Sequence, residues 1–555
     1  MLNSTDGLKQ IDIVKIFSDK RCLIIDDFPE IRGSLTRSLK TFGAKSVDTA
    51  ADGEEAIKIC ANRKYDIVIC DYNLGSGKDG QQVLEEVRFL RVLMMSSLFV
   101  MITGEQSREM VLGALECQPD DYITKPYTQA SLKLRLNKAV VRHEALIHIK
   151  TAISDGDYKK ALNDCNEMIA SGTKYASAVL KIKGQLHFLL KELKEAQKLY
   201  DSVLNKKPVV WAKLGMGKTL LALDKYDGAE EMFQSIINED DRYIEAHDML
   251  SELHEKKKDY VASQHAIEKA TQISPKSVLR HRKLAKLAEL NNDDDVALKS
   301  YQQTIKWGLN SVHESEQDYF NYARKVANVS SDSDSNETKT LLKQANTYLD
   351  RARKRYASRE DVGVQAQMVE TQLHLSSGDE NKAKSALEKC RKMYSELAAP
   401  PAEASLEFAR TLHAADKESE ARELLTNLAA RHEGNDEIMK IIDSITSEPI
   451  SEAGKTVATA LTREGIGAYD NEAFEQATQV FNEALASYPN HIGLNLNLIQ
   501  AVLADTSANG FTEKNEALIR RSLRSVGNIA RDHKQHKRYA FLTKQIDKLF
   551  PDVTV

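Results

Sequence analysis

Residues 21–127 alternate short apolar runs with longer amphipathic segments. Short apolar runs rich in branched side chains predict buried strands, and apolar positions three and four residues apart predict helices between them. Strands that alternate with helices in this way predict a parallel sheet with right-handed crossovers, which is an α/β doubly wound domain. The expected strands are residues 22–25, 46–50, 67–70, 98–102 and 122–123, and the expected helices are residues 29–41, 54–62, 81–91 and 108–115.

From about residue 145 onward the helical periodicity is continuous and contains an internal repeat. A small residue after a turn recurs at Ala161, Ala196, Ala229, Ser263 and Ala297, with spacings of 35, 33, 34 and 34 residues. A helix–turn–helix period of 34 residues is typical of tetratricopeptide (TPR) repeats, and this region resembles a TPR array, an all-α superhelix. Other positions that fit the repeat are Gly184, Tyr200, Pro208, Gly217, Tyr226, Phe233, Tyr260, Ala270, Pro275, Gly465, Phe474, Ala477, Phe481, Ala484 and Pro489, with weaker copies centred on Ala383 and Ala421.

Residues 128–154 contain neither glycine nor proline and predict one uninterrupted helix that links the two regions. Its apolar stripe has a spacing near 3.5 residues, which suits either a two-helix seam between copies in a homodimer or packing on the protein's own first repeat. The stripe consists of Leu132, Leu136, Ala139, His143, Leu146 and Ile153.

The patterns together predict one compact domain followed by a long helical array. The expected parts are an N-terminal extension over residues 1–19, an α/β domain over 20–140, the linking helix over 128–154, a TPR-like array over 147–505 that is irregular over 310–460, and capping helices over 506–555.

The composition supports a mostly helical protein, because 25 glycines and 10 prolines in 555 residues are few. A net charge of −5 argues against a protein that binds nucleic acid along its whole length, so DNA is not an expected partner. The six cysteines contain no Cys-x-x-Cys pair and indicate a reducing compartment. With neither a signal sequence nor a long apolar run, we expect a cytoplasmic protein without membrane contact.

Polar side chains stand where the predicted strands end. Asp26 and Asp27 follow the first strand, Asp71 the third, Thr103 the fourth and Lys125 the fifth. Because the carboxyl ends of parallel strands meet at one edge of the sheet, these groups should converge. Clustered carboxylates favour a cation between them, and Mg²⁺ prefers oxygen ligands. An acidic cluster with Mg²⁺ and a lysine suits phosphoryl transfer, in which one carboxylate is the nucleophile.

The same positions carry a resemblance to the response-regulator receiver domain, in particular to chemotaxis receivers, which have a flavodoxin-like fold. The resemblance implies that Asp71 accepts a phosphoryl group and that Lys125 contacts the phosphoryl oxygens. It also implies that the peptide bond between Lys125 and Pro126 is cis, which aims the lysine side chain. It implies that Thr103 captures a phosphoryl oxygen and that Tyr122 then rotates inward. The implied Mg²⁺ ligands are Asp26, Asp27, Asp71 and the backbone carbonyl of Asn73. The motifs are Ile24-Ile25-Asp26-Asp27-Phe28, Asp71-Tyr72-Asn73-Leu74, Met101-Ile102-Thr103-Gly104 and Asp121-Tyr122-Ile123-Thr124-Lys125-Pro126.

One loop departs from the receiver pattern. Gly75 stands where receivers usually carry proline, and Gly80 follows Asp71 by nine residues instead of eight. The loop over residues 75–80 is therefore one residue longer, and its glycines predict greater flexibility.

These features predict a two-component response regulator that a histidine kinase phosphorylates on Asp71. Its output would be binding of a protein or peptide in the TPR groove, and it would be no enzyme beyond its own phosphorylation and dephosphorylation. A scaffold that works without phosphorylation, with the receiver as a docking module, is the alternative. A third hypothesis is binding of RNA or an acidic partner through the basic residues 520–548.

Overall fold

The computed structural model describes residues 13–104, 116–330, 335–527, 529, 531 and 533–550. The chain forms two compact units, Met1–Leu287 with Gln303–Glu314 and Ala288–Gln302 with Ser315–Val555. Most of the expected N-terminal extension and the helix expected over residues 108–115 lie outside the described residues. Every helix within the described part is too short or too polar to span a lipid bilayer.

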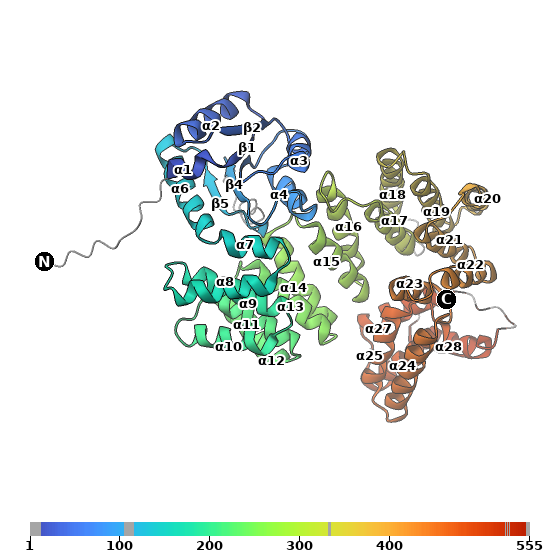
Figure 1. Ribbon diagram of the computed structural model, residues 1–555. Helices are drawn as coiled ribbons and strands as arrows, with labels where there is room; N and C mark the ends of the chain where they lie inside the picture. The colour runs from blue at the N-terminus through green and yellow to red at the C-terminus, as the bar shows by residue number, and fades with distance from the viewer. Residues whose placement is uncertain are drawn as a thin grey trace. The chain divides into compact units, whose positions relative to one another are not determined.

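The first unit begins with a parallel sheet that has helices on both sides (Figure 1). Its strands follow the order β2-β1-β3-β4-β5. Parallel pairing puts the carboxyl ends of all strands at one edge, and the order reverses between β1 and β3. The predicted α/β doubly wound, flavodoxin-like domain is confirmed. The strands are β1 (Arg21–Ile25), β2 (Ser46–Ala50), β3 (Ile67–Asp71), β4 (Leu98–Thr103) and β5 (Asp121–Thr124).

Both faces of the central strands β1, β3 and β4 are buried, because successive strand residues point to opposite sides and most residues of these three strands are apolar. Leu23 and Val68 pack against α3 and α4, whereas Ile24 and Ile69 pack against α1, α2 and α6. The flanking helices are α1 (Ile13–Ser18), α2 (Pro29–Phe42), α3 (Gly53–Asn62), α4 (Gly80–Phe89) and α6 (Gln129–Ala145).

The expected linking helix is divided in two at Leu146, where α6 ends and α7 (Ile147–Ser154) begins. The Leu146 N–H bonds to the carbonyl of His143 three residues back, which tightens the turn and redirects the chain. Leu132 and Leu136 are buried in the sheet domain, and Leu146 is buried in the first repeat. A seam between two copies would need these side chains at the surface, and the chain itself covers them.

The rest of the chain is a succession of helix pairs consistent with a TPR-like solenoid. Helices of 12 to 14 residues produce the regular period up to α14, whereas α18 to α20 have 20, 17 and 17 residues and account for the irregular stretch. The helices are α8 (Tyr158–Ala170), α9 (Ala176–Leu189), α10 (Leu193–Leu204), α11 (Val210–Ala222), α12 (Tyr226–Glu239), α13 (Ile244–Lys256), α14 (Tyr260–Ile273), α15 (Val278–Leu290), α16 (Asp294–Gly308), α17 (Glu316–Ser330), α18 (Asn336–Arg355), α19 (Glu360–Ser376), α20 (Glu380–Glu396), α21 (Ala402–Ala414), α22 (Glu418–Arg431), α23 (Asp436–Ile445), α24 (Glu452–Asp470), α25 (Phe474–Ser487), α26 (Ile492–Asn509), α27 (Glu513–Val526) and α28 (His536–Leu549).

A glycine facing an aromatic ring fixes the packing of several helix pairs. In α24 and α25, a Cβ added to Gly465 would lie 2.4 Å from the ring of Phe481, which is fully buried. Gly217 has the same relation to Phe233, also at 2.4 Å. The first helix therefore needs glycine at this position, so that the ring of the second helix can lie against its backbone.

Two substitutions in α24 should separate this packing requirement from helix propensity. Ala in place of Gly467 meets no atom within 4 Å, so it should stabilise the helix by about 0.5–1 kcal/mol. Gly465→Ala gains the same propensity but displaces the Phe481 ring, which costs about 1–3 kcal/mol. We expect Gly465→Ala to lower the thermal midpoint of the second unit and Gly467→Ala to raise it or leave it unchanged. Equal effects of both variants would contradict the packing role.

Candidate functional site

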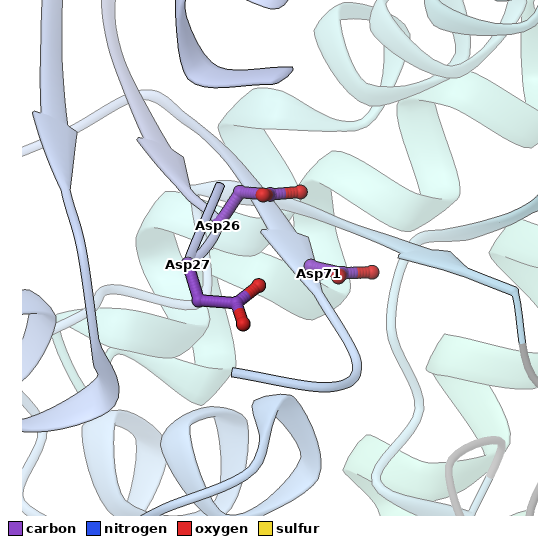
Figure 2. Close-up of side chains that lie close together, drawn as sticks. All are labelled: Asp26, Asp27 and Asp71. Carbon is purple, nitrogen blue, oxygen red and sulfur yellow. The ribbon is translucent and has the colours of Figure 1, made fainter. Parts of the chain in front are cut away.

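Three carboxylates lie together at the carboxyl edge of the sheet (Figure 2). Asp26 and Asp27 follow β1, and Asp71 is the last residue of the neighbouring strand β3. One ligand oxygen from each lies within 4.8 Å of the others. Asp26 and Asp71 are 1% and 6% exposed, so their charges are poorly screened by water.

Lys125 supplies a positive charge to this cluster. Its Nζ lies 3.0 Å from Asp71 Oδ2 and 3.4 Å from Asp26 Oδ2. Burial raises the pKa of the Asp71 carboxyl above its usual value, although Lys125 acts in the opposite direction. Burial also acts to lower the pKa of Lys125, but hydrogen bonding and attraction to Asp71 and Asp26 outweigh it and raise that pKa. The lysine is therefore charged at neutral pH.

The arrangement fits a divalent cation. Within the described residues, Asp27 Oδ1 is buried and has no hydrogen-bond partner, which is costly for a carboxylate oxygen. A single lysine faces Asp26 and Asp71, so negative charge remains in excess. Three carboxylates with one unpartnered buried oxygen are a ligand set that suits Mg²⁺. The fourth expected ligand is the backbone carbonyl of Asn73. The side-chain oxygen of this residue accepts a hydrogen bond from the Gly75 N–H at 3.2 Å.

The remaining predicted residues lie on neighbouring elements. Thr103 ends β4, is 1% exposed, and its backbone carbonyl accepts the Lys125 N–H at 2.6 Å. The predicted cis bond between Lys125 and Pro126 is present. Tyr122 of β5 is partly buried against the apolar cluster under α3 and α4.

Gly80 retains close contact with the acidic cluster despite the longer loop. A Cβ at this position would lie 2.2 Å from the backbone oxygen of Asp71, and the Gly80 N–H donates to the Tyr72 carbonyl at 2.7 Å. The additional residue is thus accommodated before Gly80, where Asp79 caps α4 by accepting from the Gln82 N–H.

The loop is also held from outside the sheet domain, which sequence reasoning missed. Lys276, in the turn after α14, donates to Tyr72 Oη at 2.9 Å and to Asp79 Oδ2 at 3.0 Å. Its Nζ lies 5.1 Å from the centroid of the Tyr72 ring and 5.6 Å from that of Trp307. An array residue therefore contacts the neighbour of Asp71 directly.

Other contacts extend this interface within the first unit. Lys78, only 8% exposed, pairs with Glu86 at 2.9 Å and donates to the Asn310 carbonyl at 2.6 Å. Arg280 pairs with Glu116 of the sheet domain at 2.6 Å. We call this interface the sheet–array contact; it comprises Tyr72, Lys78, Asp79, Gln82, Phe89 and Glu116 of the sheet domain with Ser274, Lys276, Arg280, Trp307, Leu309, Asn310 and His313 of the array.

Several of the C-terminal basic side chains that suggested RNA binding are engaged inside the second unit. Arg521 donates to Asn292 and Asn482, and Arg538 donates to Asn497 and Gln500. Lys534 pairs with Glu448. Because these basic side chains already have protein partners, fewer of them are available to bind phosphate groups of RNA than the composition of residues 520–548 indicates.

Comparison with solved structures finds receiver domains. One from Methanospirillum hungatei is 28% identical and covers 22% of this chain and 96% of that chain, with a TM-score of 0.21. The response regulator TrrA of Thermotoga maritima, solved with Mg²⁺ and BeF, is 30% identical and covers 22% and 98%, with a TM-score of 0.20.

Curated relatives and a family model match the same region. Chemotaxis protein CheY-3 of Vibrio cholerae is 33% identical over 128 residues, which are 22% of this chain and 92% of the relative. The transcriptional regulatory protein PhoP of Bacillus subtilis is 32% identical over 128 residues, 23% of this chain and 51% of the relative. The model of the response regulator receiver domain matches residues 22–137. The parallel sheet and the acidic cluster at its edge agree with these matches. The chain therefore belongs to the response-regulator receiver family.

Proposed function

We propose that this protein is a response regulator that takes a phosphoryl group from a histidine kinase onto Asp71 and passes the change to its helical array. The observation that carries the proposal is the position of Lys125 Nζ, 3.0 Å from Asp71, beside two further carboxylates. A nucleophile, a fixed cation and an anionic metal site are the parts that phosphoryl transfer requires.

The Asp71 side chain performs the transfer as a nucleophile. One of its carboxylate oxygens attacks the phosphorus of the kinase phosphohistidine, the P–N bond breaks, and its electron pair returns to the imidazole. Lys125 neutralises charge on the phosphoryl oxygens, and Thr103 binds one of them. Mg²⁺, when held by Asp26, Asp27, Asp71 and the Asn73 carbonyl, supplies further neutralisation of those oxygens. Tyr122 then fills the space that Thr103 leaves.

The output runs through the sheet–array contact. The Tyr72 N–H donates to Asp71 Oδ1 at 3.0 Å, while the hydroxyl of the same residue accepts from Lys276 at 2.9 Å. The loop that carries Asn73 also carries Lys78 and Asp79, which contact the array. A shift of the Asn73 carbonyl toward Asp71 therefore moves array contacts with it. Phosphorylation shifts the population from docked toward released forms, and the released array binds a protein partner.

Hydrogen exchange tests this coupling in the full chain. A small phosphodonor with Mg²⁺ should speed exchange in residues 72–82 and 274–280 of the wild type, because the contacts between them weaken. The Asp71→Asn variant should show no change, and residues 463–470 of the second unit provide an internal reference. Phosphoryl uptake without a change in exchange would contradict the coupling and favour the scaffold, in which the receiver stays docked whatever its phosphorylation state.

A further inference from the structure

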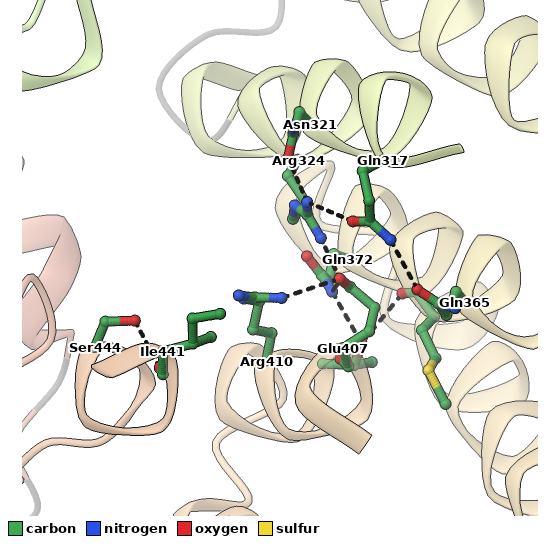
Figure 3. A network of polar contacts seen from close by, with 11 residues as sticks. Gln317, Asn321, Arg324, Gln365, Gln372, Glu407, Arg410, Ile441 and Ser444 are labelled. Atoms are coloured by element: carbon green, nitrogen blue, oxygen red, sulfur yellow. Dashed lines mark hydrogen bonds and ion pairs between the residues drawn. The ribbon is translucent and has the colours of Figure 1, made fainter. Parts of the chain in front are cut away.

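The second unit contains a layer of polar side chains on the first helices of successive pairs. Helices α17, α19, α21 and α23 contact one another in that order. On α17, Gln317, Asn321 and Arg324 share one stripe, since they are four and three residues apart. This stripe faces Gln365 and Gln372 of α19 and Glu407 and Arg410 of α21 (Figure 3). Polar residues thus occupy the helix faces where a purely structural array would place apolar ones.

Two arginines share one buried carboxylate in this layer. Glu407 is 1% exposed and accepts hydrogen bonds from Arg324, from Arg410 at 3.3 Å and from Gln372 at 2.8 Å. Burial acts to raise the pKa of Glu407, but the two arginines outweigh it and lower that pKa. The carboxylate is therefore ionised, and the arginine–glutamate cluster of Arg324, Glu407 and Arg410 carries one excess positive charge.

Arg410 is the member that reaches solvent. Its side chain is 32% exposed, compared with 18% for Arg324. Within the described part of the chain, only its Nη1 contacts a protein acceptor, which leaves Nε and Nη2 free to donate. A planar guanidinium with two parallel N–H groups matches a carboxylate. Figure 3 shows Arg410 between Glu407 and Ile441, an apolar residue of α23 that is 38% exposed.

If the arginine–glutamate cluster had only a structural role, it would lower the free energy of unfolding relative to apolar residues. Well-packed apolar residues in place of a buried ion triad are often neutral or stabilising, by about 1–4 kcal/mol. The excess positive charge destabilises the folded protein further, and an anion beside Arg410 would compensate this charge. Glu407 and Gln372, which lie beneath, hold the arginines in position without themselves reaching solvent.

We propose that the arginine–glutamate cluster is a binding site for an acidic segment of a partner polypeptide. A carboxylate of the segment pairs with Arg410, Asn321 and Gln317 hydrogen-bond to its backbone, and a neighbouring apolar side chain packs on Ile441. This proposal specifies which kind of partner the array binds, and it rests on the protein-binding output that is part of the proposed function. It does not require phosphorylation of Asp71.

Binding of defined peptides to the full chain tests the site. The probe is a fluorescein-labelled peptide of alternating glutamate and leucine, amidated at its C-terminus. We expect it to bind, whereas a glutamine–leucine peptide should not. A glutamine–leucine peptide with a free C-terminus separates side-chain carboxylates from a terminal one. Arg410→Met should weaken binding by about 10-fold or more, and Arg410→Lys should recover part of the loss.

Arg391 provides a matched control. It is 34% exposed and pairs with Glu420 on the adjacent outer helices, so Arg391→Met removes an equally exposed arginine without touching the cluster. Equal affinity of wild type and Arg410→Met, or no binding of either carboxylate peptide to wild type, would overturn the proposal.

A second measurement uses the wild type alone and does not depend on the folding of a variant. The glutamate–leucine peptide should slow modification of Arg410 by phenylglyoxal and leave that of Arg391 unchanged; unchanged modification of Arg410 would also overturn the proposal. Measuring phosphoryl uptake and peptide binding on the same wild-type sample distinguishes the two proposals. Peptide binding without phosphoryl uptake would overturn the proposed regulation and leave the site intact, whereas phosphoryl uptake without peptide binding would overturn the site alone.

Discussion

Replacement of Asp71 by asparagine is expected to abolish the mass gain of one phosphoryl group that we expect of the wild type with a small phosphodonor and Mg²⁺. The amide keeps the shape of the side chain but is not a nucleophile toward phosphorus. Asp71 lies closer to Lys125 than Asp26 does, at 3.0 Å compared with 3.4 Å, so we do not expect Asp26 or Asp27 to replace it. Intact-mass measurement of the full chain, before and after incubation, gives the result directly.

Lys125→Met provides a graded comparison for the same experiment. The nucleophile remains, but the cation that neutralises the moving phosphoryl oxygens is gone, so uptake should slow by about 100-fold or more. Asp155→Asn, an exposed carboxylate beyond the sheet domain, should leave uptake unchanged. Undiminished uptake in Asp71→Asn would show that another residue is the acceptor.

Removal of the Lys276 ammonium is expected to loosen the sheet–array contact by about 2 kcal/mol. Lys276→Met keeps the apolar stem but removes an ion pair to Asp79, a hydrogen bond to Tyr72 and two ring contacts. The side chains of Lys276 and Asp79 are 15% and 26% exposed, so the loss falls between that of a surface pair and that of a buried one. Hydrogen exchange of residues 72–82 measures the change as a local opening free energy.

Lys213→Met is the matched control for this variant. Lys213 is 13% exposed and pairs with Glu239 inside the array of the same unit, away from the sheet domain. It should leave exchange of residues 72–82 unchanged. A double-mutant cycle with Asp79→Asn should give a coupling energy of about 1 kcal/mol between Lys276 and Asp79. A coupling energy near zero would contradict the role of this ion pair.

Much of the sheet domain could be predicted because its signals are local. An apolar run that ends in Asp26 and Asp27 marks both a strand and its carboxyl end, and the order of such runs fixes a parallel sheet. The convergence of Asp26, Asp27 and Asp71 then follows from topology alone.

The sheet–array contact could not be predicted in the same way. Lys276 and Tyr72 are 204 residues apart, and each fits its own local pattern without the other. The break at Leu146 was also missed, because it depends on how the two flanking helices pack and not on a glycine or proline. The arginine–glutamate cluster could not be predicted for a related reason, because its members lie on separate helices within the irregular part of the repeat.

The coupling that we propose across the sheet–array contact would be reciprocal. If phosphorylation of Asp71 and release of Lys276 favour each other, any array ligand that favours release must raise the equilibrium yield of phosphorylation by the same factor by which phosphorylation raises its affinity. Under the proposed function, a partner that binds the released array would therefore also shift the equilibrium of Asp71 toward the phosphorylated form.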